Sequence, residues 1–302
     1  MSSVLYDVPG PKAIARNRII AGVTVLLVAA VIGFFVWRLV ATGQFTGEKW
    51  YAFTFTNVWI NVAKAAGNTL LAFGAAAAGA LVLGFVLAIG RLSDHAWVRA
   101  PFTAVIEVLR AIPVLVMMFL LYYGLPAAGV RLEPYWAVVI ALIAYNGSVL
   151  AEVIRAGVES LPRGQKEAGY AIGLRKSGVM RLVLLPQAVR AMMPVIIAQL
   201  VVTLKDTALG YIITYEELLF YARFIGSQST YGSPIVPATL IVAAIYIVLC
   251  LLLSLVANRV EKRLRRSPST AVAAPARPIA ETTDTELIAA QKGAGKFDSH
   301  GI

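Results

Sequence analysis

Residues Glu152–Pro186 read EVIRAGVESLPRGQKEAGYAIGLRKSGVMRLVLLP and separate two long apolar stretches of the chain. Basic residues alternate with apolar ones at helical spacing across this segment, and glycines and prolines punctuate it. Such a segment is too polar to cross a bilayer but is typical of short amphipathic helices at a membrane face. Because most connections between spans are short, its length and pattern predict that a partner docks there.

The composition of the whole chain is that of an integral membrane protein. Of the 302 residues, 59% are hydrophobic and 14% are charged, whereas soluble domains carry about 25% charged residues. The formal net charge of +11 is explained by basic residues that flank the apolar runs, so nucleic acid is not an expected partner. The one cysteine, Cys250, lies inside an apolar run, which excludes a disulfide framework.

Six apolar runs are long enough to cross a hydrocarbon layer of ~30 Å, which takes about 20 helical residues. They are Ile19–Val40, Asn68–Gly90, Phe102–Tyr123, Tyr135–Ile154, Val183–Leu204 and Ile235–Ala257. The first run is too long for a cleaved signal peptide, and no small-x-small cleavage site follows it. We therefore predict an all-α integral membrane protein with about six transmembrane helices.

The basic residues predict the orientation of these helices. With the N-terminus in the cytoplasm, most lysines and arginines fall in cytoplasmic segments, including the run from Arg155 to Arg181. Cytoplasmic segments of membrane proteins carry this excess of positive charge. Both termini and the Glu152–Pro186 segment are therefore expected on the cytoplasmic side.

The second apolar run is rich in glycine and alanine. Small residues lie four apart at Gly74 and Ala78, and again at Ala80, Gly84 and Ala88. Such faces let helices approach closely in lipid. The pattern favours a packing seam within one bundle over a dimer face, although it fits both.

A specific motif lies inside the Glu152–Pro186 segment. The pattern E-A-A, three residues, G, nine residues, I, one residue, L-P is matched by Glu167-Ala168-Gly169, Gly173, Val183 and Leu185-Pro186. Gly169 and Val183 depart from it. The form with glycine in place of the second alanine is typical of one subfamily of the proteins that carry this pattern. On this motif, and on the strings VIEVLR at 105–110 and LKDTALGYII at 204–213, the chain resembles the permease subunit of bacterial polar amino acid importers of the ATP-binding-cassette (ABC) class, of the histidine, glutamine or glutamate type.

The resemblance implies a fold and a set of domains. Residues 65–263 are expected to form the five-span transmembrane domain of a type I ABC importer, with cytoplasmic coupling helices. Residues 19–41 are then an additional N-terminal span behind a cytoplasmic N-terminus at 1–18. Residues 264–302 are rich in Pro, Ala, Thr and Lys and are expected to be a disordered cytoplasmic tail.

The resemblance also implies partners and a location. These are ABC ATPase subunits that bind ATP and Mg, an extracytoplasmic solute-binding protein, a second permease subunit as homodimer or heterodimer, and the lipids of the bacterial inner membrane. The helix around Glu167 would insert into a groove of the ATPase. The implied coupling residues are Arg163, Glu167, Ala168, Gly169, Gly173, Leu185 and Pro186.

The residues of this motif support a docking role in physical terms. Gly169 and Gly173 are four apart and would leave a small surface that another helix or a partner can approach. Pro186 is expected to mark the turn into the next span. The alternative is an interfacial helix that only rests on lipid.

No enzymatic motif accompanies these features. The nearest string to a phosphate-binding loop, Gly173 to Gly178, continues with Val179 and Met180 instead of Lys and Ser or Thr. We therefore expect no catalysis, no metal site and no cofactor in this chain.

Polar residues within the spans are candidates for the substrate pathway, because ionisable groups are costly in lipid. Glu107 and Arg110 are three apart, as are Glu152 and Arg155, so each pair fits either a structural ion pair or a substrate contact. Gln187 and Gln199 add polar positions to the fifth span. The candidates are Glu107, Arg110, Asn146, Ser148, Glu152, Arg190, Lys205, Asp206 and Thr207.

Three functions remain open at this stage. The favoured one is a permease subunit for ATP-driven uptake of a polar amino acid, and the cations Arg190 and Lys205 favour glutamate. An ion-coupled secondary amino acid transporter is the second, although no internal repeat of the kind common in such carriers is found. The third is a non-transporting membrane scaffold.

Overall fold

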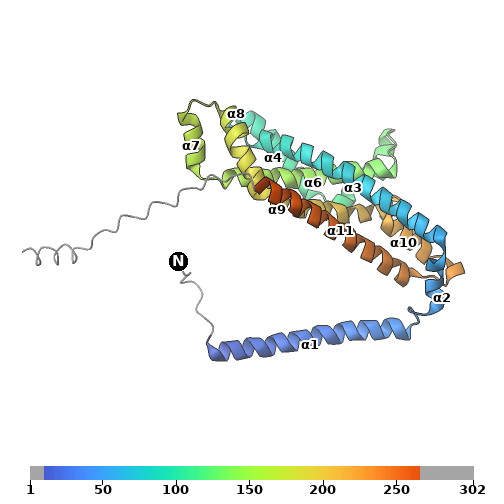
Figure 1. Cartoon of the computed structure of the whole chain (residues 1–302). Helices are drawn as coiled ribbons and strands as arrows, with labels where there is room; N and C mark the ends of the chain where they lie inside the picture. Colours follow the sequence, from blue (N-terminus) through green and yellow to red (C-terminus); the bar gives the residue numbers. More distant parts are fainter. Residues whose placement is uncertain (1–9, 266–302) are drawn as a thin grey trace, which may run out of the picture. The chain divides into compact units, whose positions relative to one another are not determined.

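The computed structural model describes residues 10–265, and the regular elements of these residues are helices throughout (Figure 1). The long helices are α1 (Pro11–Ala41), α3 (Thr56–Arg91), α4 (Ala96–Ala111), α6 (Pro134–Glu159), α9 (Leu185–Asp206) and α11 (Ile235–Arg265). The short ones are α2 (Gly47–Trp50), η1 (Tyr51–Thr54), α5 (Val114–Phe119), η2 (Leu120–Gly124), η3 (Leu125–Ala128), α7 (Arg163–Ala171), α8 (Lys176–Gly178), η4 (Val179–Leu184), η5 (Thr207–Ile213), α10 (Leu218–Gly226) and η6 (Ser229–Tyr231).

Five helices of the described chain are long and apolar enough to cross a membrane, and a bent pair brings the number to six. This confirms the prediction of about six spans. The third predicted span, Phe102–Tyr123, is the bent pair: α4 and the helix that starts at Val114 meet at 96°. The cause is Pro113, which has no N–H to donate and holds Ile112 in an extended conformation (φ −84°, ψ 120°).

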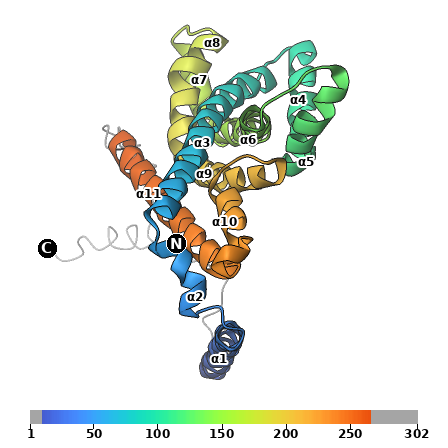
Figure 2. The same ribbon diagram turned by 90° about the vertical axis from the view of Figure 1, so that its right-hand side faces the viewer.

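Helix α6 packs against α3, α4, α5 and α9, and Figure 2 shows it nearly end-on among them. Its contact with α3 depends on small residues. A Cβ atom on Gly84 would lie 2.9 Å from Leu150 Cβ, and one on Gly147 would lie 3.0 Å from a methyl carbon of Leu83. Ala80, Gly84 and Ala88 are buried, so this part of the small-residue face is the predicted seam within one bundle.

The remaining predicted pair of small residues does not pack in this chain. Gly74 and Ala78 are exposed, and a Cβ atom on Gly74 would have no neighbour within 4 Å. The seam itself continues toward the N-terminus of α3 through Ala72 and Ala76, which are buried in one cluster with residues of α6. Gly74 and Ala78 are therefore uncovered because they lie on another side of α3.

Residues Lys176–Ile213 form one long helical stretch. Pro186 lies in the first turn of α9, directly after the π-helical segment η4, so the predicted turn at Pro186 is wrong. A π-helical segment accommodates a residue that cannot donate its own N–H, because it changes the hydrogen-bond register without ending the helix.

Helix α1 begins at Pro11, eight residues before the predicted span, and it contains no buried residue. Proline is favoured at the first helical position, where its missing N–H has no intrahelical role. The predicted boundary between residues 18 and 19 therefore falls inside a helix. The predicted tail, 264–302, lies outside the described residues apart from the last two residues of α11.

Candidate coupling segment and translocation residues

Helix α7 carries the motif residues, and Gly173 terminates it. The Leu174 N–H donates to the Gly169 carbonyl at 3.2 Å, and the Gly173 N–H donates to the Tyr170 carbonyl at 2.9 Å. These two bonds form a Schellman cap, which needs a left-handed residue at the position of Gly173. Gly173 has φ +83°, and a Cβ atom there would meet nothing within 4 Å. The role of this glycine is therefore conformational, which corrects the prediction that it offers a small surface.

Gly169 does provide a small surface, and a segment of the same chain covers it. A Cβ atom on Gly169 would lie 2.9 Å from Val179 Cγ2 of η4, and Gly169 is buried. Near the start of α7, Gln187 Nε2 of α9 donates to Gln165 Oε1 at 3.3 Å. The helix is thus attached to η4 and α9 along one side.

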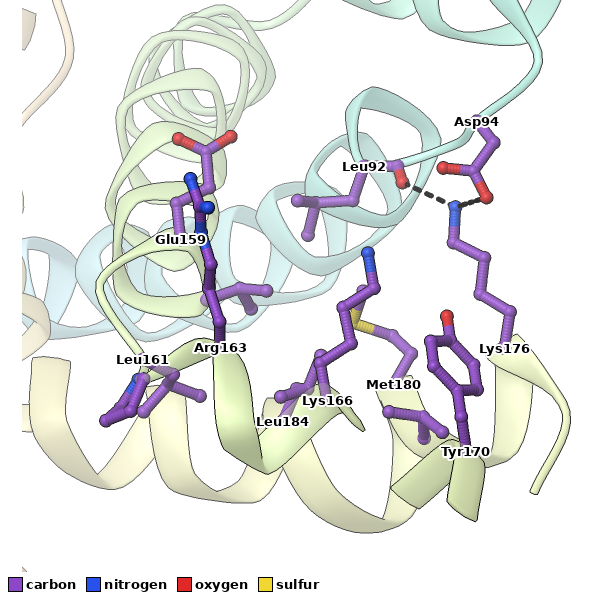
Figure 3. A pocket seen from close by; sticks show the side chains of 13 residues that line it. Leu92, Asp94, Glu159, Leu161, Arg163, Lys166, Tyr170, Lys176, Met180 and Leu184 are labelled. Carbon is purple, nitrogen blue, oxygen red and sulfur yellow. Dashed lines mark hydrogen bonds and ion pairs between the residues drawn. The ribbon is translucent and has the colours of Figure 1, made fainter. Parts of the chain in front are cut away.

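A second attachment joins this segment to the turn between α3 and α4. Lys176 Nζ forms an ion pair with Asp94 and donates to the Leu92 carbonyl at 3.5 Å (Figure 3). The hydrogen bond from Lys176 holds the pKa of Asp94 below its ordinary value. Leu92 caps the C-terminus of α3, where a cation is favourable because the helix dipole is negative there.

These attachments enclose a cavity of about 210 Å³. Arg163, Lys166 and Tyr170 of α7 line it opposite Leu92, Asp94 and Lys176 (Figure 3). The opposite side of α7 is open, with Glu167 and Ala168 exposed and Ile172 77% exposed. Leu185 and Pro186, the remaining motif residues, lie in the first turn of α9 and are half-buried and exposed respectively.

An ion network lies at the same end of the bundle. Arg155 Nη2 lies 2.5 Å from Glu152 Oε1, and Arg155 also pairs with Glu159. Arg91 Nη1 of α3 lies 2.9 Å from Glu152 Oε2. The predicted Glu152–Arg155 pair is therefore present, and it is structural because both ends are already occupied by protein partners.

The predicted pair between Glu107 and Arg110 does not form. Glu107 Oε1 lies 3.9 Å from Arg91 Nη2, and the ion pairs among the described residues do not include Arg110. The physical reason is that the last turn of α3 brings the guanidinium of Arg91 close to Glu107. Arg110 and Glu107 are both exposed, so neither is held in the interior of this chain.

Asn146 and Ser148 are buried within an unbroken α6. Asn146 Nδ2 donates to the Leu142 carbonyl at 3.0 Å, and Ser148 Oγ donates to the Tyr145 carbonyl at 2.7 Å. Gln199 Nε2 of α9 donates to Asn146 Oδ1 at 2.7 Å. The amide pair formed by Asn146 and Gln199 is the polar link between α6 and α9 in the apolar part of the bundle.

The remaining candidates on α9 do not converge. Arg190 and Lys205 are exposed and 15 residues apart, which is about 22 Å along a helix. Asp206 is half-buried, and Thr207 is buried with its hydroxyl donating to the Leu204 carbonyl at 2.7 Å. One site for a small ligand cannot include both cations within this chain.

Sequence reasoning missed Glu217, which is fully buried just before α10. Its carboxylate accepts from the N–H groups of Leu219 at 2.8 Å and Phe220 at 2.7 Å, and from the Tyr246 hydroxyl at 2.7 Å. Glu217 is thus the N-cap of α10 and ties it to α11. The available signal was an acidic residue directly before a nine-residue apolar helix.

Comparison with known proteins places this geometry in a family. The model of the family described as "Binding-protein-dependent transport system inner membrane component" matches residues 80–266. This match covers more than half of the chain, and the chain belongs to that family. It is therefore a multi-pass membrane permease of the ABC importer class, and its all-helical fold is that of a type I importer.

Two relatives are similar over most of their length. The glutamate transport system permease protein GluD of Corynebacterium glutamicum is 38% identical over 234 residues, which are 75% of this chain and 84% of the relative. The probable glutamine ABC transporter permease protein GlnM of Bacillus subtilis is 34% identical over 200 residues, which are 66% and 91%.

Solved structures agree on the fold. A chain from "an amino acid ABC transporter with histidines" is 29% identical, with a TM-score of 0.63 over 70% of this chain and 97% of that chain. A chain of the MetNI methionine ABC transporter, at 17% identity and a TM-score of 0.59 over 70% and 99%, supports the fold alone.

Proposed function

We propose that this chain forms the translocation pathway of an ATP-driven importer for a polar amino acid, with glutamate favoured. Support for the substrate class comes from relatives named for glutamate and glutamine transport and from the solved amino acid transporter. The family itself is defined by dependence on a binding protein. We infer that a separate extracytoplasmic protein presents the substrate and that separate ATPase subunits, which bind ATP and Mg, drive its transport.

The observation that carries the proposal is the two-sided nature of α7. One side is attached to η4, α9 and the α3–α4 turn, and the other presents Glu167, Ala168 and Ile172 to solvent. An ATPase groove that receives the open side would move α7 as a rigid body. Gly169 against Val179, and Lys176 with Asp94, would then pass the movement to α9 and to α3 and α4.

The pathway would use the amide pair of Asn146 and Gln199. Each amide has donors and an acceptor, so a polar ligand can replace one partner without leaving a buried group unsatisfied. A second permease subunit, identical or related, would complete the pathway around this pair. We place both termini and α7 in the cytoplasm of a bacterial inner membrane, as the charge distribution predicts.

The test is a charge introduced on the open side of α7. A docked isoleucine contributes about 1.5–3 kcal/mol, so Ile172→Glu should weaken copurification of the ATPase by roughly tenfold or more. It should reduce ATP-dependent uptake of labelled glutamate and glutamine in proteoliposomes in parallel. Trp97→Glu is the matched control, because Trp97 is 78% exposed and lies on α4, outside the α7 segment.

Three results would contradict the proposal in different ways. Uptake that persists without ATP on an ion gradient identifies a secondary transporter. Absence of any uptake, with partners bound, identifies a scaffold. An intact chain that never copurifies with an ABC ATPase removes the coupling role of α7.

A further inference from the structure

A second cavity, of about 320 Å³, lies between α3 and α10, two helices that pack against each other (Figure 1). Asn61, Lys64 and Asn68 line it from α3. Because they are three and four residues apart, they form one polar stripe along that helix. Tyr221 and Phe224 line it from α10, and Glu216, two residues before that helix, lines it as well.

The cavity is on the outer side of the predicted membrane. Helix α3 has 36 residues and is therefore about 54 Å long, whereas the hydrocarbon layer is ~30 Å thick. Its apolar run begins at Asn68, so the 12 residues from Thr56 to Gly67 project about 18 Å beyond it. Asn61 and Lys64 are thus accessible from the extracytoplasmic solution, and Asn68 lies at the boundary of the apolar run.

Two opposite charges line this cavity without neutralising each other. Lys64 and Glu216 are both exposed, and the ion pairs found among the described residues include neither. A cation and an anion that face one cavity at a distance are complementary to a ligand with one carboxylate and one ammonium group. Asn61 and Asn68 add polar side chains to the lining of the same cavity.

The walls of the cavity are tied together, so this arrangement exists before any ligand binds. Asn68 Nδ2 donates to the Glu216 carbonyl at 2.8 Å, and the Tyr215 hydroxyl donates to the Asn68 carbonyl at 2.6 Å. Glu217, which follows Glu216 in the chain, is buried and is the N-cap of α10. Such preorganisation lowers the entropy lost on binding.

We propose that this cavity is an outer binding site for the zwitterionic main chain of an amino acid, in which Lys64 binds the carboxylate and Glu216 binds the ammonium group. Tyr221 and Phe224 lie beside the ligand side chain. The site would hold substrate released by the binding protein before it enters the pathway, and in this respect it rests on the proposed function. Because its charged contacts are to the main chain, it discriminates weakly between side chains.

The experiment measures binding of labelled glutamine to the full-length chain in lipid nanodiscs, without the binding protein. Lys64→Gln and Glu216→Gln should each weaken binding at least tenfold. Arg131→Gln and Glu133→Gln are matched controls, because both residues are exposed and lie in the loop before α6, and they should bind like the wild type. All four side chains are exposed, so loss of fold is not expected, and size-exclusion profiles check this.

Glutamine derivatives that lack one charged group test which ligand group each protein charge binds. Glutamine methyl ester lacks the carboxylate, so its weaker binding should respond to Glu216→Gln and not to Lys64→Gln. N-acetylglutamine lacks the ammonium group and should show the reverse response. Wild-type affinity for free glutamine in both variants would overturn the proposal.

Uptake separates this inference from the proposed function. If the complete transporter imports amino acids while both variants bind glutamine normally, the outer site is wrong and the importer stands. If both variants bind glutamine normally but lose association with the binding protein, the cavity is a protein docking surface, which also overturns the proposal. If glutamine binds as expected but no ATP-dependent uptake occurs, the site stands and the importer function fails.

Discussion

Substitution of Gly173 tests whether the end of α7 is set by backbone conformation. Gly173 has φ +83° and open space around its α-carbon, so an alanine there meets no clash and only the left-handed conformation is unfavourable. That conformation costs an L-residue about 1–2 kcal/mol. Local opening of the cap in Gly173→Ala should therefore be about 5–30 times more frequent than in the wild type.

The assay is amide hydrogen exchange of the purified chain in nanodiscs. The amides of residue 173 and Leu174 donate the two cap hydrogen bonds, so their exchange should accelerate by that factor in Gly173→Ala. Gly173→Asn should show a smaller effect, because asparagine tolerates the left-handed region. Gly164→Ala is the control: its Cβ atom would meet nothing within 4 Å and its φ is not positive.

The coupling role predicts a second consequence. If α7 transmits movement, Gly173→Ala should lower ATP-dependent uptake while the chain still folds and inserts. Equal exchange rates in Gly173→Ala and the wild type would refute the reasoning about the cap. Faster exchange with unchanged uptake would leave the cap in place and refute its part in coupling.

Four further predictions concern other parts of the bundle. Lys176→Met removes the ion pair with Asp94 and should lower the amount of substrate imported per ATP hydrolysed. Lys176→Arg keeps the positive charge and should retain most of this coupling ratio. An unchanged ratio in Lys176→Met would contradict the proposed transmission to α3 and α4. Glu217→Ala removes the cap of α10 and should lower the free energy of unfolding by ~2 kcal/mol, measured as a fall in thermal midpoint. Burial raises the pKa of Glu217 to about 7 from 4.5, so the folded state binds the proton more tightly than the unfolded state. The free energy of unfolding of the wild type should therefore fall as pH rises from 4.5 to about 7 and level off above that pH. Glu217→Gln should lack this slope. Gly84→Ala should cost about 1–3 kcal/mol through overpacking against α6, whereas Gly74→Ala, with no neighbour within 4 Å, should be neutral in the same thermal assay.

Much of the architecture could be predicted from the sequence because the bilayer imposes simple rules. A span needs about 20 apolar residues with all backbone groups bonded internally, and six runs satisfy this condition. The bend in the third span also had a local cause in Pro113, although the span was predicted without it. The motif at Glu167–Gly173 predicted the position of α7, because a polar segment with helical spacing between two spans is typical of a short helix outside the hydrocarbon layer.

The candidate pathway residues were less predictable. Residue type and depth in a span selected Glu107 and Arg110 as a pair, but the pair is absent because Arg91 of another helix reaches Glu107. Asn146 was predicted as a pathway candidate, and that role stays a prediction; the structure adds that it is buried and paired with Gln199, 53 residues away. No local pattern identifies a partner at that separation.

The sequence by itself determined the class of protein, its spans and the position of α7, because these depend on composition, motif and local period. Only the tertiary structure decided which small residues form the seam, why Gly173 is a glycine, and that Glu217 joins α10 to α11. It also brought Lys64 and Glu216, which are 152 positions apart, to one cavity. These features depend on distances between helices, and such distances follow from side-chain packing across the whole bundle.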